Sequence, residues 1–212
     1  MKVPFSWLKD YVDIDVSPEE LQEKLFSCGF EVEELKYVGE EIDRCVVGRI
    51  RSIEKHPDAD KLKICRLDCG EYGEDIQIVT GADNVFEGAL VPVALDGSSL
   101  HGGVKIKKGK LRGVESCGML CSGEELGIND DWYDGADVNG ILILQEEIPV
   151  GTDIKKVVGL DDYIFDIAVT ANRPDCQSVY GIAREVAAVL KKPLKPVELT
   201  YEASDFSITC AG

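Results

Sequence analysis

The sequence has no long hydrophobic run and no leader-like beginning. Nowhere in its 212 residues does an apolar run reach the roughly 18 residues that a membrane-spanning helix needs. The opening MKVPFSWLKD also lacks the long apolar core of a secretory signal peptide. We therefore expect a cytoplasmic protein without a membrane partner, whose eight cysteines are free thiols.

Motifs for nucleotide or nucleophile chemistry are missing as well. No glycine-rich loop is followed by Lys-Ser or Lys-Thr, the pattern that cradles phosphates in P-loop proteins. His56 and His101 are the only histidines, and no base belongs to a recognisable nucleophile motif. We expect no catalytic residue in this chain.

The cysteines are not spaced like common zinc ligands. Cys65 and Cys69 are four residues apart, as are Cys117 and Cys121, whereas zinc ribbons usually use CxxC pairs. The even spacing puts Cys65 and Cys69 on one face of a predicted strand, which favours packing in a core. We predict no metal site.

Basic residues are scarce overall but concentrated in one place. The chain has 23 basic and 40 acidic residues, for a net charge of −17. Residues 44–128 hold 12 of the basic and 13 of the acidic ones, so the flanks carry nearly all the negative charge. Within this middle, residues 105–112 (KIKKGKLR), here called the lysine ribbon, contain five basic residues and no acidic one. This distribution indicates a domain boundary and a local anion-binding surface.

The flanking segments have helical patterns. Trp7, Leu8, Tyr11 and Val12 share one face of a predicted helix. The stretch SPEE at 17–20 has a serine cap, a proline at the first helical position and a glutamate three residues after the cap, which is a capping box. A further helix is predicted from a cap at Asp175 to the residues before Pro193.

The middle of the chain alternates like a set of strands. Short strands are predicted at 46–53, 62–67, 76–79, 91–95 and 105–112. Pro92 favours an edge position or a strand start. In the last strand Val104, Ile106 and Leu111 are expected to turn inward. So many short strands within about 100 residues predict a small barrel or sandwich.

The lysine ribbon has two interpretations. Lysines can simply keep a strand edge soluble and unpaired. Alternatively, Lys105, Lys107 and Lys110 project from one face and neutralise successive phosphates of a nucleic acid. Aromatic residues are few here, with only Tyr72 and Phe86 before Trp132, so base stacking cannot dominate. His56, before a proline, is expected to be a turn residue.

Together these features resemble known families. The run from HPDADKLKICRLDCGE through IVTGADNVFEGALVPVALDGSSLHGGVKIKKGKLRGVESCGMLCSGEELGI resembles the tRNA-binding oligonucleotide-fold (OB-fold) domain of synthetase-associated proteins. The flanks, MKVPFSWLKDYVDIDVSPEELQEKLFSCGFEVEEL and DIAVTANRPDCQSVYGIAREVAAVL, are similar to the two halves of the N-terminal domain of bacterial phenylalanine–tRNA ligase β subunits.

The resemblance implies an α+β fold with an inserted β-barrel of OB type. A discontinuous α+β domain would comprise residues 1–41 and 151–195, the tRNA-binding OB domain 42–150, and the start of a following editing-region domain 196–212. The whole enzyme would attach phenylalanine to tRNA with ATP and Mg²⁺, as an α2β2 assembly with a catalytic α subunit. This fragment would bind tRNA, not DNA, and hold no cofactor itself.

The resemblance also suggests which residues contact tRNA. They are Lys55, Lys61, Lys63, Asn84, Lys105, Lys107, Lys108, Lys110, Arg112, Ser116 and Met119. Two alternatives stay open. One is a freestanding tRNA-binding chaperone or secretion-type module, which would share the middle but not the flanks. The other is a protein-interaction barrel without appreciable RNA affinity.

Overall fold

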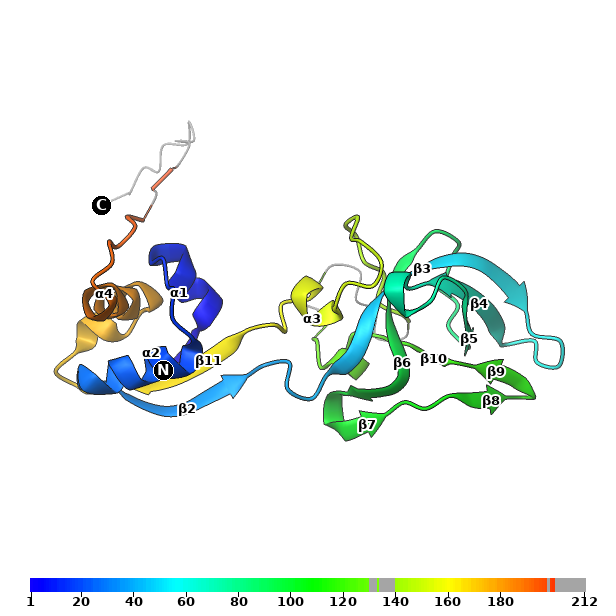
Figure 1. The fold of residues 1–212 in the computed structure, drawn as a ribbon, viewed down its shortest axis with the longest axis horizontal. Helices are drawn as coiled ribbons and strands as arrows, with labels where there is room; N and C mark the ends of the chain where they lie inside the picture. Colours follow the sequence, from blue (N-terminus) through cyan, green and yellow to red (C-terminus); the bar gives the residue numbers. More distant parts are fainter. Residues whose placement is uncertain (130–132, 134–139, 198, 201–212) are drawn as a thin grey trace, which may run out of the picture. The chain divides into compact units, whose positions relative to one another are not determined.

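The chain folds into two compact units. A computed structural model describes residues 1–129, 133, 140–197, 199 and 200. One unit, the outer unit, comprises Met1–Lys36 and Tyr163–Gly212, and the other, the middle unit, comprises Tyr37–Asp162 (Figure 1). Segments 37–41 and 151–162 thus belong to the middle unit in this division. The predicted domain at 196–212 lies almost wholly outside the described residues.

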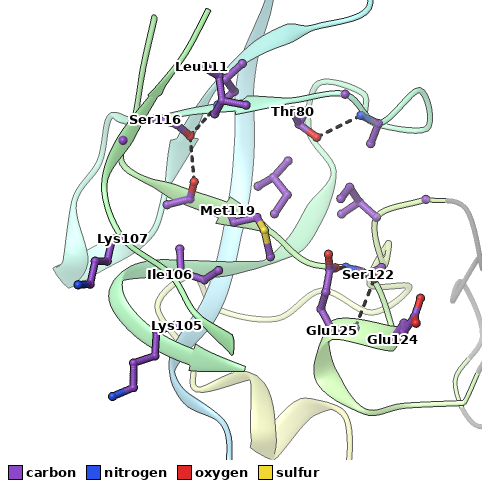
Figure 2. Close-up of a pocket in the computed structure, with 18 of the residues that line it drawn as sticks. Thr80, Lys105, Ile106, Lys107, Leu111, Ser116, Met119, Ser122, Glu124 and Glu125 are labelled. Carbon is purple, nitrogen blue, oxygen red and sulfur yellow. Dashed lines mark hydrogen bonds between the residues drawn. The ribbon is translucent and has the colours of Figure 1, made fainter. Parts of the chain in front are cut away.

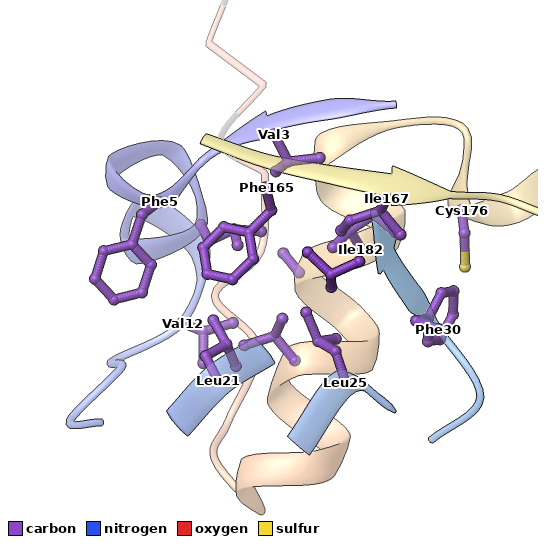
Figure 3. Packing of buried hydrophobic residues seen from close by; sticks show 14 of the residues in the cluster. Val3, Phe5, Val12, Leu21, Leu25, Phe30, Phe165, Ile167, Cys176 and Ile182 are labelled. Carbon is purple, nitrogen blue, oxygen red and sulfur yellow. The ribbon is translucent and has the colours of Figure 1, made fainter. Parts of the chain in front are cut away.

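The outer unit packs helices on a small sheet. The sheet has the order β1-β11-β2, and β1 runs antiparallel to β11. Phe165 and Ile167 of β11 and Ile182 of α4 are fully buried, and Leu21 and Leu25 of α2 pack into the same core (Figure 3). The elements are β1 (Lys2–Pro4), α1 (Phe5–Tyr11), α2 (Pro18–Ser27), β2 (Glu31–Tyr37), β11 (Tyr163–Ala168), the 3-10 turn η5 (Pro174–Cys176) and α4 (Val179–Leu190).

Of the two predicted helix caps, one is present and the other is not. The capping box is confirmed, since Ser17 Oγ accepts from Glu20 N and Glu20 Oε2 accepts from Ser17 N, each at 3.2 Å. The cap predicted at Asp175 is wrong: Ser178 caps α4, accepting from the backbone N of Gly181 at 3.0 Å. Asp175 instead lies in η5, where its carboxylate binds arginine.

The predicted face of the first helix is also partly wrong. Phe5, Leu8 and Val12 are buried, whereas Trp7 is 57% exposed. The spacing of Phe5, Leu8 and Val12 is three then four residues, so they form one helical stripe and turn Trp7 toward solvent.

The middle unit is built mainly of antiparallel strands. Its main sheet has the order β10-β6-β3-β4-β5, with β7 also paired to β6, and β8 and β9 form a separate hairpin (Figure 1). The elements are β3 (Asp43–Lys55), β4 (Lys63–Asp68), η1 (Gly70–Tyr72), β5 (Ile76–Thr80), β6 (Leu90–Leu100), η2 (His101–Gly103), β7 (Val104–Lys105), β8 (Gly109–Leu111), β9 (Val114–Ser116), β10 (Gly118–Leu120), η3 (Glu124–Leu126) and α3 (Ile154–Val157).

Pro92 lies near the start of β6, as predicted, but β6 is not an edge strand. It pairs with β3 on one side and with β10 on the other. The carbonyl of Pro92 accepts from Cys121 N at 3.1 Å, and the carbonyl of Cys121 accepts from Leu142 N at 3.0 Å. Cys121 O is the carbonyl that lies opposite the Pro92 nitrogen. Because it accepts from Leu142 N, it has a hydrogen-bond donor even though proline has no N–H.

The strand pairings among the described residues do not close into a barrel. The two end strands of the sheet, β5 and β10, nevertheless approach each other. Cys117 N donates to Gln77 O at 2.8 Å, and Val79 N donates to Ser116 Oγ at 3.0 Å. The coarse prediction of a mixed α and β protein with antiparallel sheets is therefore confirmed.

Four of the eight cysteines belong to the core of the middle unit. Cys45, Cys65, Cys69 and Cys121 are buried there. Burial raises the pKa of the Cys65 thiol to about 11 and that of Cys69 to about 12, so both stay protonated at neutral pH. The core-packing interpretation of Cys65 and Cys69 is confirmed.

One group of possible metal ligands occurs in the described part of the chain. Asp175, Cys176 and Glu185 place ligand atoms within 4.8 Å of one another. Arg173 Nη2 contacts all three, at 3.1 Å from Asp175 Oδ2, 3.0 Å from Cys176 Sγ and 2.7 Å from Glu185 Oε1. A guanidinium thus supplies the positive charge, and we interpret the group as an ion-pair network.

Within the described ranges, no helix has the length and hydropathy needed to cross a bilayer.

Candidate nucleic-acid interface

The sequence pattern predicted a single strand for the lysine ribbon. In the structure the ribbon contains parts of two strands, β7 and β8. After β7, Ile106 continues alongside β6: its N donates to Ser98 O and its O accepts from Gly97 N, both at 2.9 Å. Lys108 N then donates to the Asp96 carboxylate at 2.7 Å, and the chain leaves β6 to form β8. Ile106 is buried as predicted. Val104 and Leu111, expected inside, are 52% and 43% exposed.

The far end of the ribbon is a tight hairpin turn. Leu111 of β8 pairs with Val114 of β9, which leaves Arg112 and Gly113 as the two turn residues. Their φ angles are +48° and +88°. Positive φ at both positions is the requirement of a type I′ turn, and glycine meets it without strain. The turn holds Arg112 at the exposed tip.

His56 fastens this hairpin to the rest of the unit. Its side chain is 95% buried, with Nε2 3.1 Å from Leu111 O, and its Nδ1 accepts from Asp58 N at 3.1 Å. Because Nδ1 accepts, Nε2 carries the proton and donates to the Leu111 carbonyl. The predicted turn residue therefore also joins the β3–β4 turn to the tip of β8.

A groove of about 720 Å³ lies beside the ribbon (Figure 2). Lys105 and Lys107 lie on one side of it and Glu124 and Glu125 on the other, with Met119 between them (Figure 2). Its walls come from the end of β5, the ribbon, β10 and η3. The lining residues are Val79, Thr80, Gly81, Ala82, Lys105, Ile106, Lys107, Gly109, Lys110, Leu111, Ser116, Gly118, Met119, Leu120, Ser122, Glu124, Glu125, Gly140 and Ile141.

Three predicted cations line the groove and form no ion pair within the described residues. These are Lys105, Lys107 and Lys110, all exposed. Lys108 differs, because it forms an ion pair with Glu115 at 2.8 Å. That hydrogen bond raises the pKa of Lys108 and lowers the pKa of Glu115. Lys110 is opposite Glu115 in the β8–β9 register, and its charge also lowers the pKa of Glu115. No ion pair within the described residues holds Lys105 or Lys107 away from a ligand.

Other predicted cations lie at the β3–β4 turn. Lys55 is opposite Lys63 in the strand register, and Lys61 is exposed in the turn itself. Lys63 Nζ contacts Asp83, at 3.1 Å from its carbonyl oxygen and 3.8 Å from its Oδ1. These lysines and Arg112 do not line the groove. The His56 contact with Leu111 nevertheless brings this turn beside the ribbon tip.

Three predicted contacts are polar or soft rather than cationic. Both polar side-chain atoms of Asn84 form hydrogen bonds within the protein. Its Nδ2 donates to Ile141 O at 2.8 Å, and its Oδ1 accepts from Ile141 N at 3.0 Å. Ser116 lines the groove, but its hydroxyl donates to Gly118 O at 2.9 Å and accepts from Val79 N. Met119 lines the groove with its side chain partly exposed.

The sequence analysis missed the acidic side of the groove. Glu124 and Glu125 begin η3, fourteen and fifteen residues beyond Lys110 in the chain. The adjacent acidic pair is visible in SGEELG, whose closing glycine is typical of a short helical turn. Nothing in that pattern indicates that it faces lysines, because the approach depends on how η3 packs beyond β10.

Comparison with known proteins identifies the family. The family model described as "Putative tRNA binding domain" matches residues 45–153. The chain is 54% identical over 201 residues, 95% of its length, to 25% of the phenylalanine–tRNA ligase β subunit of Clostridium acetobutylicum. It is 44% identical over its whole length to 26% of the corresponding β subunit of Syntrophus aciditrophicus.

A solved structure, that of a MetRS-related protein from Pyrococcus horikoshii, covers 51% of this chain and 85% of its own, with 28% identity and a TM-score of 0.34. The chain spans about a quarter of the length of the curated relatives it matches. The matched domain covers half of the chain, and the relatives are similar along nearly all of it. The chain therefore belongs to the tRNA-binding domain family, and its sequence is similar to a fragment of phenylalanine–tRNA ligase β subunits.

Proposed function

We propose that this chain is a non-catalytic, tRNA-binding region of a phenylalanine–tRNA ligase β subunit. The observation that carries the proposal is the set of unpaired lysines, Lys105, Lys107 and Lys110, on the wall of the groove. They occur within the segment matched by the tRNA-binding family. Each phosphate that such a lysine neutralises releases counterions, and this release supplies affinity for a nucleic-acid backbone.

The β3–β4 turn extends this surface. Lys55 and Lys61 are exposed there, and His56 links the turn to the tip that carries Arg112. Cations on these two neighbouring hairpins could contact successive phosphates of a nucleic-acid backbone that runs from the groove across the ribbon tip. Lys108 contributes less, because Glu115 already offsets its charge.

The architecture of the middle unit favours an OB fold. An OB fold is a partly open five-stranded barrel, and β3, β4, β5, β10 and β6 would be its strands. The hydrogen bond from Cys117 N to Gln77 O lies where β5 would meet β10. Slow amide exchange at Cys117 is expected if this junction is permanent. Exchange at the rate of an open loop would contradict closure there.

We propose that the remaining activity belongs to the whole protein. The relatives are named phenylalanine–tRNA ligase β subunits, and we propose that the whole protein attaches phenylalanine to tRNA. It would act in the cytoplasm, together with an α subunit in an α2β2 assembly. ATP and Mg²⁺ would act in the whole protein, as the resemblance to the ligase family implies. Residues 1–41 and 151–195 would serve assembly, with the tRNA-binding domain inserted at 42–150.

The test is a titration of labelled tRNA into the 212-residue chain at two salt concentrations. A variant with Lys105→Glu, Lys107→Glu and Lys110→Glu is compared with one carrying Lys2→Glu, Lys36→Glu and Lys156→Glu. The second set makes the same change in net charge at exposed lysines outside the groove.

The wild type and the second variant are expected to bind tRNA with affinity that falls steeply with salt. In the groove variant the slope of log K against log salt should shrink by about 2 to 3, for three lost phosphate contacts. Equal binding by both variants would contradict the assignment of the surface. No binding by any protein at low salt would favour the alternative of a protein-interaction barrel.

A further inference from the structure

We propose that the groove reads an unpaired guanine base, with Glu124 as the residue that determines specificity. The inference rests on the proposed function, because it assumes that the ribbon lysines hold an RNA backbone. It adds a base-reading site to a surface that the sequence analysis described only by its positive charge.

The two sides of the groove carry opposite charge. Lys105 and Lys107 lie on one side and Glu124 and Glu125 on the other (Figure 2). Carboxylates repel phosphate, so the acidic side is not suited to the same part of the ligand as the lysines. A nucleotide fits both sides if its phosphate lies at the lysines and its base presents N–H donors to the carboxylates.

The carboxylates of Glu124 and Glu125 differ in their hydrogen bonds. Oε2 of Glu125 accepts from both the backbone N and the hydroxyl of Ser122, each at 2.5 Å. That carboxylate is therefore held by the turn in front of η3. Glu124 is exposed, and although its backbone carbonyl accepts from Gly127 N at 2.9 Å, its carboxylate has neither a hydrogen bond nor an ion pair with a residue in the described ranges. Its two oxygens remain available as acceptors for a ligand.

The floor between the two sides is apolar. Ile106 and Leu120 are 9% and 3% exposed, and Met119 lies between the lysines and the glutamates. A base ring can lie on this surface through dispersion, to which the polarisable sulfur of methionine contributes. The volume of about 720 Å³ is within the range typical of small-ligand sites, so it admits a nucleotide.

The donor pattern selects the base. Guanine presents two adjacent donors on its Watson–Crick edge, N1–H and the N2 amino group, which match the two oxygens of one carboxylate. Adenine and cytosine place a ring acceptor beside their amino donor, and uracil has one N–H between two carbonyls. In a duplex this edge is already paired, so only an unpaired guanine can use it.

The experiment measures binding of the 212-residue chain to labelled RNA octamers, UUUXUUUU, in which X is guanosine, inosine, adenosine or uridine. Inosine differs from guanosine only by loss of the N2 amino group. The proteins are the wild type, Glu124→Gln, the matched control Glu71→Gln, and the variant with Lys105, Lys107 and Lys110 changed to Glu. Glu71 is exposed on η1 and does not line the groove.

Wild type and Glu71→Gln are expected to bind the guanosine octamer about tenfold more tightly than the inosine octamer, as for one good bidentate contact. Glu124→Gln should bind both equally, and the lysine variant should bind all four weakly. Equal binding of guanosine and inosine by a wild type that still needs its lysines would refute base reading and leave the proposed function standing. Failure of every octamer and of tRNA to bind at low salt would instead refute the proposed function.

Discussion

Replacing His56 tests how the lysine ribbon is held. The imidazole makes two hydrogen bonds, from Nε2–H to the Leu111 carbonyl and from Asp58 N to Nδ1, each 3.1 Å long. A glutamine side chain places its amide nitrogen near the position of Nε2, so His56→Gln can keep the bond to Leu111. An asparagine oxygen lies near the position of Nδ1, so His56→Asn can keep only the bond from Asp58. The two variants thus separate the two contacts.

The expected magnitude follows from one hydrogen bond. Losing a neutral hydrogen bond costs about 1 kcal/mol net, which makes opening of the β8–β9 hairpin about fivefold more frequent. Both variants lose one bond and similar packing, so their overall unfolding free energies should fall by similar amounts. Only His56→Asn should release the ribbon tip.

Amide hydrogen exchange measured by NMR is the assay. In His56→Asn, protection at residues 109–116 should fall about fivefold, while His56→Gln stays near wild type. Affinity for tRNA should weaken in His56→Asn by no more than the same factor, because ordering the hairpin is the only added cost. Identical exchange at residues 109–116 in the two variants would refute the role given to the Leu111 contact.

Three further predictions concern stability. Asn84→Ala removes both hydrogen bonds to Ile141 and should lower the unfolding free energy of the middle unit by about 2 kcal/mol, measured by urea unfolding; an unchanged midpoint would contradict it. Ser178→Ala removes the cap of α4 and should lower the unfolding free energy of the outer unit by about 1 kcal/mol. The NMR signals of the outer unit should then show a lower urea midpoint, while the midpoint of the middle-unit signals stays unchanged. The Arg173 hydrogen bond holds the pKa of Asp175 well below its usual range. The stabilisation that this hydrogen bond supplies is therefore complete at pH values above the ordinary pKa range of a carboxyl group. It is lost as the pH falls toward the pKa of Asp175 in the folded protein. Urea unfolding of the outer unit at several acidic pH values should show a shallower loss of stability for Asp175→Asn, and parallel curves would count against this account.

Features that depend on neighbouring residues could be predicted from the sequence. The capping box at Ser17 and Glu20 needs only residues three apart. Strand alternation predicted the burial of Ile106 correctly, but it was wrong for Val104 two residues earlier. The even spacing of Cys65 and Cys69 likewise predicted their burial. In the confirmed cases the physical cause involves only residues close together in the sequence, so the pattern of residue types was sufficient.

The candidate site depends on contacts between distant residues. His56 meets Leu111 across 55 positions, and Asn84 meets Ile141 across 57. Glu124 lies across the groove from Lys105 only because the segment after β10 packs beside the ribbon. Composition and spacing determined that the middle of this chain carries a concentrated positive charge. Tertiary packing decided which lysines form no ion pair and which carboxylates lie across the groove from them, because burial and ion pairing are properties of the surfaces that meet.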